Sequence, residues 1–248
     1  MKPDTVSFGR QDVTPDDKTR LVQGVFDRVA SRYDVMNDIM SLGTHRLFKR
    51  MLVERTGLRP GNNVLDLAGG TGDMAALLAP VVGETGLVAL TDLNADMMRV
   101  GRNRLLDDGC AGVQFCQAPA ECLPYADKTF HCAVISFGLR NFTSKETAFG
   151  ELLRVLRPGG RLLVLEFSKP DDPTLGALYK GFQALWPTIG QALVGDSEPY
   201  RYLVESIEKH PKQKALALTM RDAGFVDTQY HDLLGGVAAI HEAMRSEV

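Results

Sequence analysis

Apolar runs alternate with polar breaks along most of this chain, and the pattern predicts strands that are followed by helices. Each of five runs is five or six residues long and is bounded by turn residues, which is typical of strands in a sheet. They are Asn63–Leu67, Leu87–Asp92, Val113–Gln117, His131–Ser136 and Arg161–Glu166. Strands that alternate with helices in this way form a mostly parallel sheet with helices on both faces.

The C-terminal end predicts two more strands, Phe225–His231 and Gly236–His241, which are joined by a short hairpin and add an antiparallel edge. The predicted fold class is therefore α/β, with a doubly wound, mostly parallel seven-stranded sheet. Helices are predicted over Gly72–Ala79, which Pro80 ends, and over Ala95–Asp107 and Thr147–Leu156, with a tight turn at Pro158-Gly159-Gly160.

Two regions lie outside this alternation. Residues 1–20 are polar and predict a flexible or loosely docked arm, and Val22–Ala30 and Asp34–Leu58 predict helices with a break near Ser41-Leu42-Gly43. We assign residues 1–58 to an N-terminal arm and helical lid, and residues 59–248 to the main domain. The connection from Phe167 to Gly224 is too long for a loop, so a helical insertion is predicted at about 169–224, with helices Leu175–Trp186 and Pro199–Glu208.

Composition excludes several classes of function. The 248 residues carry 28 basic and 31 acidic side chains and no long basic run, so no nucleic-acid partner is expected. The four cysteines do not have the spacing of a zinc site, and no metal is expected. Residues 1–20 lack an apolar signal region, and Lys180 and Pro187 interrupt the most apolar later segment, so we predict a cytoplasmic protein.

The first predicted strand ends on a carboxylate, Asp66, and leads into a glycine loop and a helix start at Asp73. Such a loop lets a ligand approach the backbone of Gly70, and Gly70–Ala75 loosely matches a G-x-G-x-x-A pattern, so an NAD-dependent oxidoreductase is an alternative. However, Asp66 and Asp73 would repel a pyrophosphate. A sulfonium amino acid tolerates both carboxylates, which favours S-adenosylmethionine as the cofactor.

The next two strand ends supply further cofactor candidates. Asp92, with Leu93 beside it, follows the second strand, where a carboxylate can accept hydrogen bonds from ribose hydroxyls; capping the next helix is the alternative. Pro119 and Ala120 follow the third strand, where an adenine ring would lie, although a plain loop fits the local sequence equally well.

Four longer motifs carry a resemblance to a known family. They are Tyr33–His45, Ala68–Asp73, Ser136–Asn141 and Arg154–Ser168. Together they closely resemble the ubiquinone/menaquinone biosynthesis C-methyltransferases, a family of class I S-adenosylmethionine-dependent methyltransferases, and the similarity runs from about Phe26 to Ile240. The resemblance implies methylation of a ring carbon on a polyprenylated benzoquinol or on a demethylnaphthoquinol.

The same resemblance assigns cofactor binding to Thr71, Asp92, Pro119, Ala120 and Ser136. The family often has Asn where this chain has Pro119, which has no amide, so the Ala120 N–H is the better expected partner for adenine. Ala68 also stands where class I methyltransferases typically have glycine.

Arg140 and Asn141 follow the fourth strand and are the predicted catalytic residues. In the family this arginine is proposed to act as the base together with a water. An arginine does not deprotonate in proteins, so we expect Arg140 to stabilise a phenolate or polarise a water while Asn141 orients it. A surface ion pair is the alternative for Arg140.

Four side chains are predicted to bind substrate: Tyr33 and His45 in the lid, and Tyr200 and Tyr202 in the insertion. Helix capping, core packing or an aromatic cluster would explain the same residues. The helical spacing of Leu178, Phe182, Leu185 and Trp186 indicates core or an apolar tunnel for a prenyl tail.

The expected partner is a lipophilic prenylated quinol, and because of its tail we expect peripheral contact with the inner face of a membrane. The resemblance also implies a possible homodimer or a quinone-biosynthesis assembly. A non-catalytic assembly protein with the same fold remains an alternative.

Overall fold

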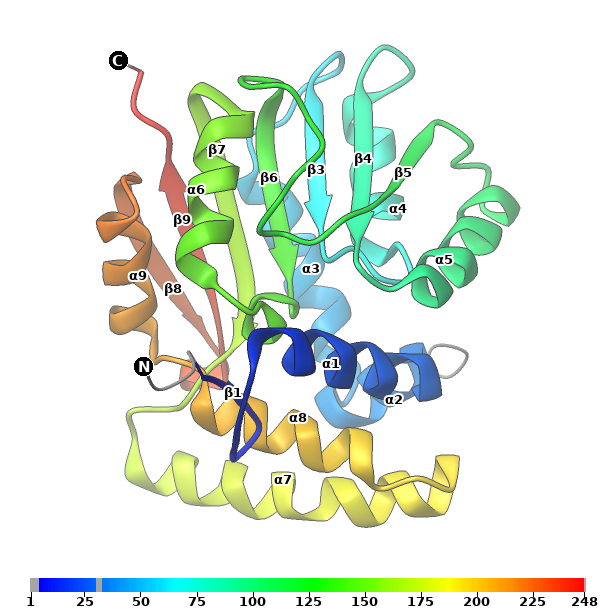
Figure 1. The fold of residues 1–248 in the computed structure, drawn as a ribbon, viewed down its shortest axis with the longest axis vertical. Helices are drawn as coiled ribbons and strands as arrows, with labels where there is room; N and C mark the ends of the chain where they lie inside the picture. Colours follow the sequence, from blue (N-terminus) through cyan, green and yellow to red (C-terminus); the bar gives the residue numbers. More distant parts are fainter. Residues whose placement is uncertain (1–4, 30–32, 248) are drawn as a thin grey trace.

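A seven-stranded sheet forms the centre of the protein in the computed structural model, which describes residues 5–29 and 33–247 (Figure 1). The strand order is β5-β4-β3-β6-β7-β9-β8, and β9 is antiparallel to both of its neighbours. The strands are β3 (Asn63–Leu67), β4 (Leu87–Asp92), β5 (Val113–Gln117), β6 (Phe130–Ser136), β7 (Leu156–Phe167), β8 (Val226–Leu233) and β9 (Ala238–Met244). The predicted doubly wound, mostly parallel sheet is confirmed.

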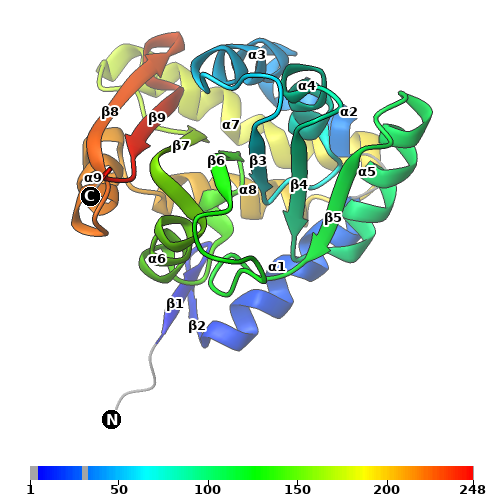
Figure 2. The same ribbon diagram turned by 90° about the horizontal axis from the view of Figure 1, so that it is seen from above.

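Each face of the sheet carries its own apolar core, because successive strand residues point to opposite sides. Val64 packs into one core and Leu65 into the other, and both side chains are fully buried. Helices α3 (Thr44–Arg55), α4 (Asp73–Val82) and α5 (Ala95–Asp107) supply the first core, and α6 (Lys145–Val155) and α9 (Gln213–Asp222) supply the second (Figure 2).

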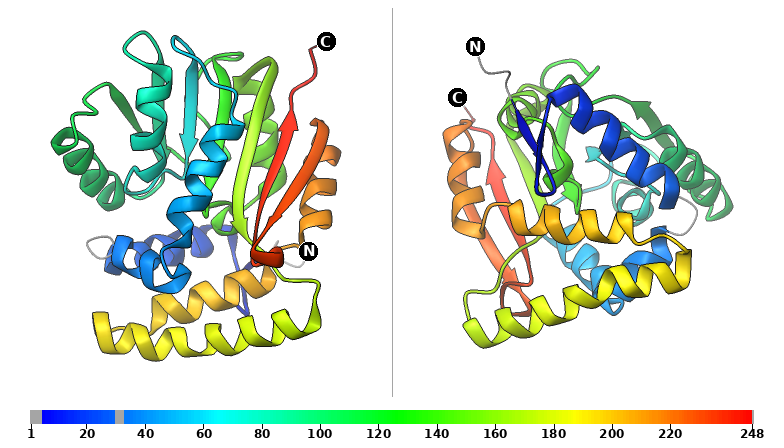
Figure 3. Two further views of the ribbon diagram at one scale, coloured as in Figure 1. Left: turned by 180° about the vertical axis from the view of Figure 1, so that it is seen from behind. Right: turned by 60° about the horizontal axis from the view of Figure 1, so that its bottom comes forward.

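Four other helices gather at the carboxyl ends of the parallel strands (Figures 1 and 3). They are α1 (Pro15–Val29) and α2 (Tyr33–Ser41) from the N-terminal region, and α7 (Pro173–Val194) and α8 (Glu198–Lys209) from the predicted insertion. Parallel sheets bind ligands at this edge, so these helices cover the part of the molecule where a site is expected. The division of the chain after residue 58 stays a prediction.

The N-terminal segment differs from the predicted arm. It forms a hairpin of β1 (Val6–Phe8) and β2 (Gln11–Val13), and helix α1 begins at Pro15. The hairpin is fastened to α8, since the Arg10 guanidinium pairs with Glu208 at 3.0 Å and the Arg10 N–H donates to Glu205 at 3.2 Å. These are contacts between distant segments, which the local pattern does not reveal.

Several boundaries also differ. Pro80 lies inside α4 instead of ending it, and Pro187 lies inside α7. Strand β7 starts at Leu156 and therefore includes the predicted turn at 158–160, and α9 was not predicted. No helix among residues 5–29 and 33–247 has the length and apolar character that crossing a membrane requires.

Gly190 lets α7 and α8 approach closely, so the methyl group that an alanine would add at this position should affect stability. A Cβ at this position would lie 2.2 Å from the buried ring of Tyr200. We expect Gly190→Ala to lower the free energy of unfolding by about 1–3 kcal/mol, because an overpacked contact must shift. Urea denaturation followed by circular dichroism measures this change.

Gly181 on the same helix provides the matched control, since a Cβ there would meet no atom within 4 Å. Gly181→Ala should be neutral or should stabilise by up to about 1 kcal/mol through helix propensity. Equal effects of the two substitutions would contradict close packing at Gly190.

Candidate active site

The carboxyl ends of β3 to β6 form an elongated depression that consists of two adjoining pockets. The two share Ala68, Ser136 and Phe137. The larger pocket is also lined by Asp92, Leu93, Pro119, Ala120 and Asn141, and the smaller one by Lys49, Asp66, Thr71 and Asp73. The structure thus brings most of the predicted cofactor residues into one continuous space.

Asp92 is held by the backbone at the end of β4. One carboxyl oxygen accepts the Gly70 N–H at 2.8 Å and the other accepts the Asn94 N–H at 2.8 Å. Burial raises the pKa of this carboxyl group, and these backbone N–H groups oppose that rise. The N-cap of α5 is Asn94, whose side chain accepts from the Met97 N–H, so helix capping is not the role of Asp92.

Asp66 is the most unusual group of the site. Its side chain is fully buried at the end of the central strand β3, and neither carboxyl oxygen makes a hydrogen bond of normal geometry within the described residues. Burial raises its pKa to about 7, although the nearby Lys49 charge acts in the opposite direction. The buried Ser136 hydroxyl likewise lacks a partner among the described residues. Buried polar groups are normally paired, so both groups are suited to a polar ligand in the smaller pocket.

The backbone around this pocket is strained at two residues. Ala68 has φ of 58° and Phe137 has φ of 57°, a region that costs a residue other than glycine about 1 kcal/mol. They follow the adjacent strands β3 and β6, and Gly138 lies so close to Ala68 that a Cβ would approach it to 2.5 Å. Strained residues of this kind gather at ligand sites, and here they flank the smaller pocket.

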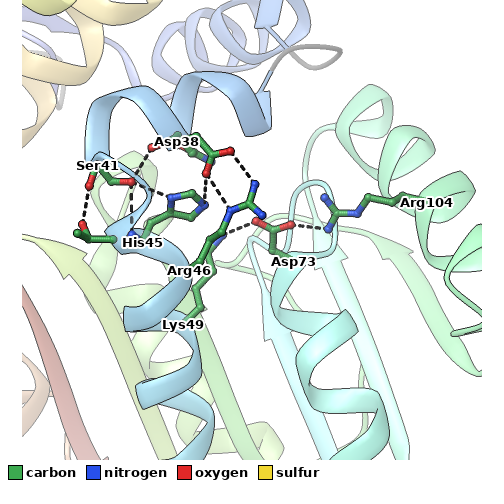
Figure 4. A network of polar contacts seen from close by, with 9 residues as sticks. Asp38, Ser41, His45, Arg46, Lys49, Asp73 and Arg104 are labelled. Carbon is green, nitrogen blue, oxygen red and sulfur yellow. Dashed lines mark hydrogen bonds and ion pairs between the residues drawn. The ribbon is translucent and has the colours of Figure 1, made fainter.

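Lys49 of α3 was not predicted as a site residue. Its ammonium donates to Asp73 Oδ2 at 2.6 Å, and the Arg104 guanidinium from α5 pairs with Asp73 Oδ1 (Figure 4). Burial alone would raise the Asp73 pKa, but the two cations outweigh it and lower that pKa to about 2. The only hint in the sequence was the acidic helix start at Asp73, which does not reveal its partners.

The predicted catalytic Arg140 is buried in an ion pair. Its Nη1 donates to Glu166 Oε1 at 2.8 Å and to the Phe137 carbonyl, and its guanidinium lies over the Phe167 ring at 5.6 Å from the centroid. The alternative of a surface ion pair is wrong, because the side chains of Arg140 and Glu166 are 5% and 1% exposed. Glu166 was missed, although it lies within the Arg154–Ser168 motif.

Asn141 connects the larger pocket to the insertion. It lines that pocket, and its side-chain oxygen accepts a hydrogen bond from Tyr202 Oη at 3.0 Å. The Tyr202 ring stacks on Phe8 of the hairpin, with centroids 4.5 Å apart. Residues from both ends of the chain therefore hold the Asn141 side chain in place.

The other predicted substrate residues are not brought together. His45 is buried at the α2–α3 corner, where Nδ1 lies 2.8 Å from the Ser41 hydroxyl, and Tyr200 is buried in the core against Gly190. The Tyr33 side chain lies outside the described part of the structure. Burial and the Lys49 charge lower the His45 pKa, which favours a neutral imidazole near pH 7.

Helix α7 presents polar atoms that the sequence did not predict. Tyr179 Oη, Gln183 Nε2 and Trp186 Nε1 are buried and make no hydrogen bond of normal geometry within the described residues, although Gln183 is near enough to Tyr179 to oppose the rise in the Tyr179 pKa that burial causes. The ring centroids of Trp186 and Phe167 are 6.3 Å apart, and those of Phe167 and Phe137 are 4.5 Å apart. An aromatic cluster therefore extends from the pocket to α7. The predicted apolar stripe is wrong for Leu178 and Leu185, which are 68% and 56% exposed.

Solved structures share this fold. A SAM-dependent methyltransferase from Aquifex aeolicus matches with a TM-score of 0.64 at 18% identity, over 86% of this chain and 97% of that one. A Haemonchus contortus phosphoethanolamine N-methyltransferase in complex with S-adenosyl-L-methionine matches with a TM-score of 0.61 at 14% identity, over 80% and 52%. At these identities the likeness concerns the fold alone.

Sequence comparison is more specific. The chain is 51% identical over 243 residues to the ubiquinone/menaquinone biosynthesis C-methyltransferase UbiE of Ectopseudomonas mendocina, which covers 97% of this chain and 95% of the relative. The protein of the same name from Francisella tularensis subsp. novicida is 50% identical over 240 residues, 96% of each chain. The model of the ubiE/COQ5 methyltransferase family matches residues 12–245. This chain therefore belongs to the ubiE/COQ5 methyltransferase family.

Proposed function

We propose that this protein transfers the methyl group of S-adenosylmethionine to a ring carbon of a polyprenylated quinol. The observation that carries the proposal is the buried Asp66 carboxyl group, which has no hydrogen bond of normal geometry within the described residues and lies in the same site as the backbone-held Asp92, in a family whose relatives are C-methyltransferases. Family membership decides against the NAD-dependent oxidoreductase. The substrate is 2-polyprenyl-6-methoxy-1,4-benzoquinol, demethylmenaquinol or both, in keeping with the names of the relatives.

The residues present fit the proposed cofactor. Asp66 and Ser136 would receive its amino-acid end in the smaller pocket, next to the loop of Gly70 and Thr71. Asp92 would accept hydrogen bonds from the ribose hydroxyls, with Leu93, Pro119 and Ala120 along the nucleoside. When bound, the cofactor supplies an electrophilic methyl group on a positively charged sulfur.

The chain itself must favour the quinolate form of the substrate, whose ring carbon is more nucleophilic than that of the neutral quinol. We assign this role to the buried ion pair of Arg140 and Glu166, in which Glu166 keeps the guanidinium in position next to Asn141 in the chain. Asn141 would orient a substrate oxygen by its amide group, since it lines the pocket and Tyr202 fixes its side chain. Holding the ring carbon close to the methyl group contributes the rest of the rate acceleration.

The aromatic cluster on α7 is the proposed site of the quinol ring. Phe137, Phe167 and Trp186 offer apolar faces, and Tyr179 and Gln183, which make no hydrogen bond of normal geometry within the described residues, offer polar groups for the ring oxygens. A prenyl tail is strongly apolar, so we extend the proposal to peripheral contact with a membrane surface. The exposed Leu178 and Leu185 side chains on α7 support such contact, and would equally serve a homodimer or a quinone-biosynthesis assembly.

The direct test is an anaerobic methylation assay with S-adenosylmethionine and short-tailed forms of both quinols, followed by mass spectrometry. We expect a mass gain of one methylene on at least one reduced quinol and none on the oxidised quinones, because an electron-poor ring is not nucleophilic. If the cofactor binds but neither quinol is methylated, the protein is the non-catalytic assembly protein instead.

Asp92→Ala should weaken S-adenosylmethionine binding about 100-fold by isothermal titration calorimetry. The substitution removes charge-assisted hydrogen bonds to the ribose and the anchor of the Gly70 N–H, which together are worth about 2–3 kcal/mol. Asp96→Ala, in the first turn of α5, is the control and should bind normally. Unchanged binding by the Asp92 variant would remove ribose recognition from this residue.

Asp66→Asn should stabilise the ligand-free protein while weakening cofactor binding. The folded-state pKa of about 7 exceeds the ordinary 3.8, so the folded protein holds this proton more tightly than the unfolded chain. Stability from this group is therefore full at low pH and is lost as pH rises towards 7. At pH 8 the variant should gain about 2 kcal/mol in free energy of unfolding, roughly half of what the pKa difference allows.

Denaturant titrations at pH 4 and pH 8 check the sign, because at pH 4 the two proteins should differ little. Destabilisation of equal size at both pH values would show that burial of the Asp66 charge is not costly.

A further inference from the structure

Asp73 has two cations although one carboxylate needs only one. Lys49 donates to Oδ2 at 2.6 Å and Arg104 binds Oδ1, so each oxygen has its own partner (Figure 4). The Lys49 side chain is 8% exposed, against 28% for Arg104. The more buried of the two cations is therefore the one that lines the smaller pocket.

The charges of the smaller pocket are incomplete for the ligand proposed to lie there. Among the described residues that line it, Asp66 and Asp73 are acidic and Lys49 is the one cation. The amino-acid end of S-adenosylmethionine carries both an ammonium and a carboxylate. Asp66 is suited to the ammonium, whereas the carboxylate would face two acidic side chains unless a cation turns towards it.

Lys49 can make this turn at little cost. Its ammonium sits on a flexible four-carbon stem, and Arg104 remains on Asp73 when Lys49 leaves. Lys49 and Asp73 both line the smaller pocket, so the exchange requires a change of the Lys49 side-chain rotamer within the same site. If the Lys49–Asp73 ion pair served only to join α3 to α4, the presence of Arg104 on the same carboxylate would have no explanation.

We propose that Lys49 exchanges Asp73 for the α-carboxylate of the methyl donor, and that Arg104 then neutralises Asp73 alone. This inference rests on the proposed function of the smaller pocket. The demethylated product carries the same carboxylate, so Lys49 recognises donor and product alike and does not distinguish them. On the same helix, Arg46 pairs with Asp38 of α2 at 2.6 Å and is therefore not the cation assigned to the carboxylate (Figure 4).

Isothermal titration calorimetry with three ligands tests the exchange: S-adenosylmethionine, S-adenosylhomocysteine and decarboxylated S-adenosylmethionine. The unaltered protein should prefer the first two. Lys49→Gln should weaken both of them by the same factor, about tenfold to a hundredfold, and leave the decarboxylated ligand unchanged. Lys49→Arg should retain the preference, and Arg50→Gln, an exposed neighbour on α3, should bind like the unaltered protein.

Thermal unfolding of each ligand-free variant separates binding from folding. If Lys49 is only a structural bridge, Lys49→Gln weakens all three ligands equally and lowers the unfolding temperature, which overturns the proposal. Unchanged binding of all three overturns it as well. Failure of the unaltered protein to bind S-adenosylmethionine at all would instead refute the proposed function.

Discussion

The cost of burying the Asp66 carboxyl group is the constraint on which the rest of the site depends. The group is fully buried at the end of β3, between β4 and β6, and neither of its oxygens has a hydrogen bond of normal geometry within the described residues. Its pKa of about 7 measures that cost. A fold gains nothing from such a group by itself, and proteins commonly give up stability at the places where they bind ligands. The strained backbone at Ala68 and Phe137, which border the same pocket, follows the same logic.

Two carboxyl groups seven positions apart have opposite environments, and the difference defines what each can do. Burial raises the Asp66 pKa to about 7, whereas the charges of Lys49 and Arg104 outweigh burial and lower the Asp73 pKa to about 2. A pair of titratable groups pushed in opposite directions is typical of functional sites. Asp66 is therefore suited to pair with a cationic group of a ligand. Asp73 stays ionised and binds Lys49 and Arg104.

Local pattern was enough to predict three of the parallel strands, and not to predict the partners of the site residues. Asn63–Leu67, Leu87–Asp92 and Val113–Gln117 match the structure at both ends, because each is an apolar run between turn residues. Proline did not end α4, since tertiary packing kept its last turn helical around Pro80. The motif indicated Arg140, but its burial against Glu166, 26 residues away, depends on the pairing of β6 with β7. Sequence spacing does not encode such pairings.

The two halves of the reaction meet where residues distant in sequence are held together. On the cofactor side, α3 delivers Lys49 to the smaller pocket. On the other side, Tyr202 from the insertion stacks on Phe8 and fixes Asn141 in the larger pocket. Phe137 lies between them, because it lines both pockets and its carbonyl is bound by Arg140. Asn141 is therefore positioned by Tyr202 of α8, which itself packs on the N-terminal hairpin, whereas Phe137 is positioned by Arg140 and its ion pair with Glu166 of β7.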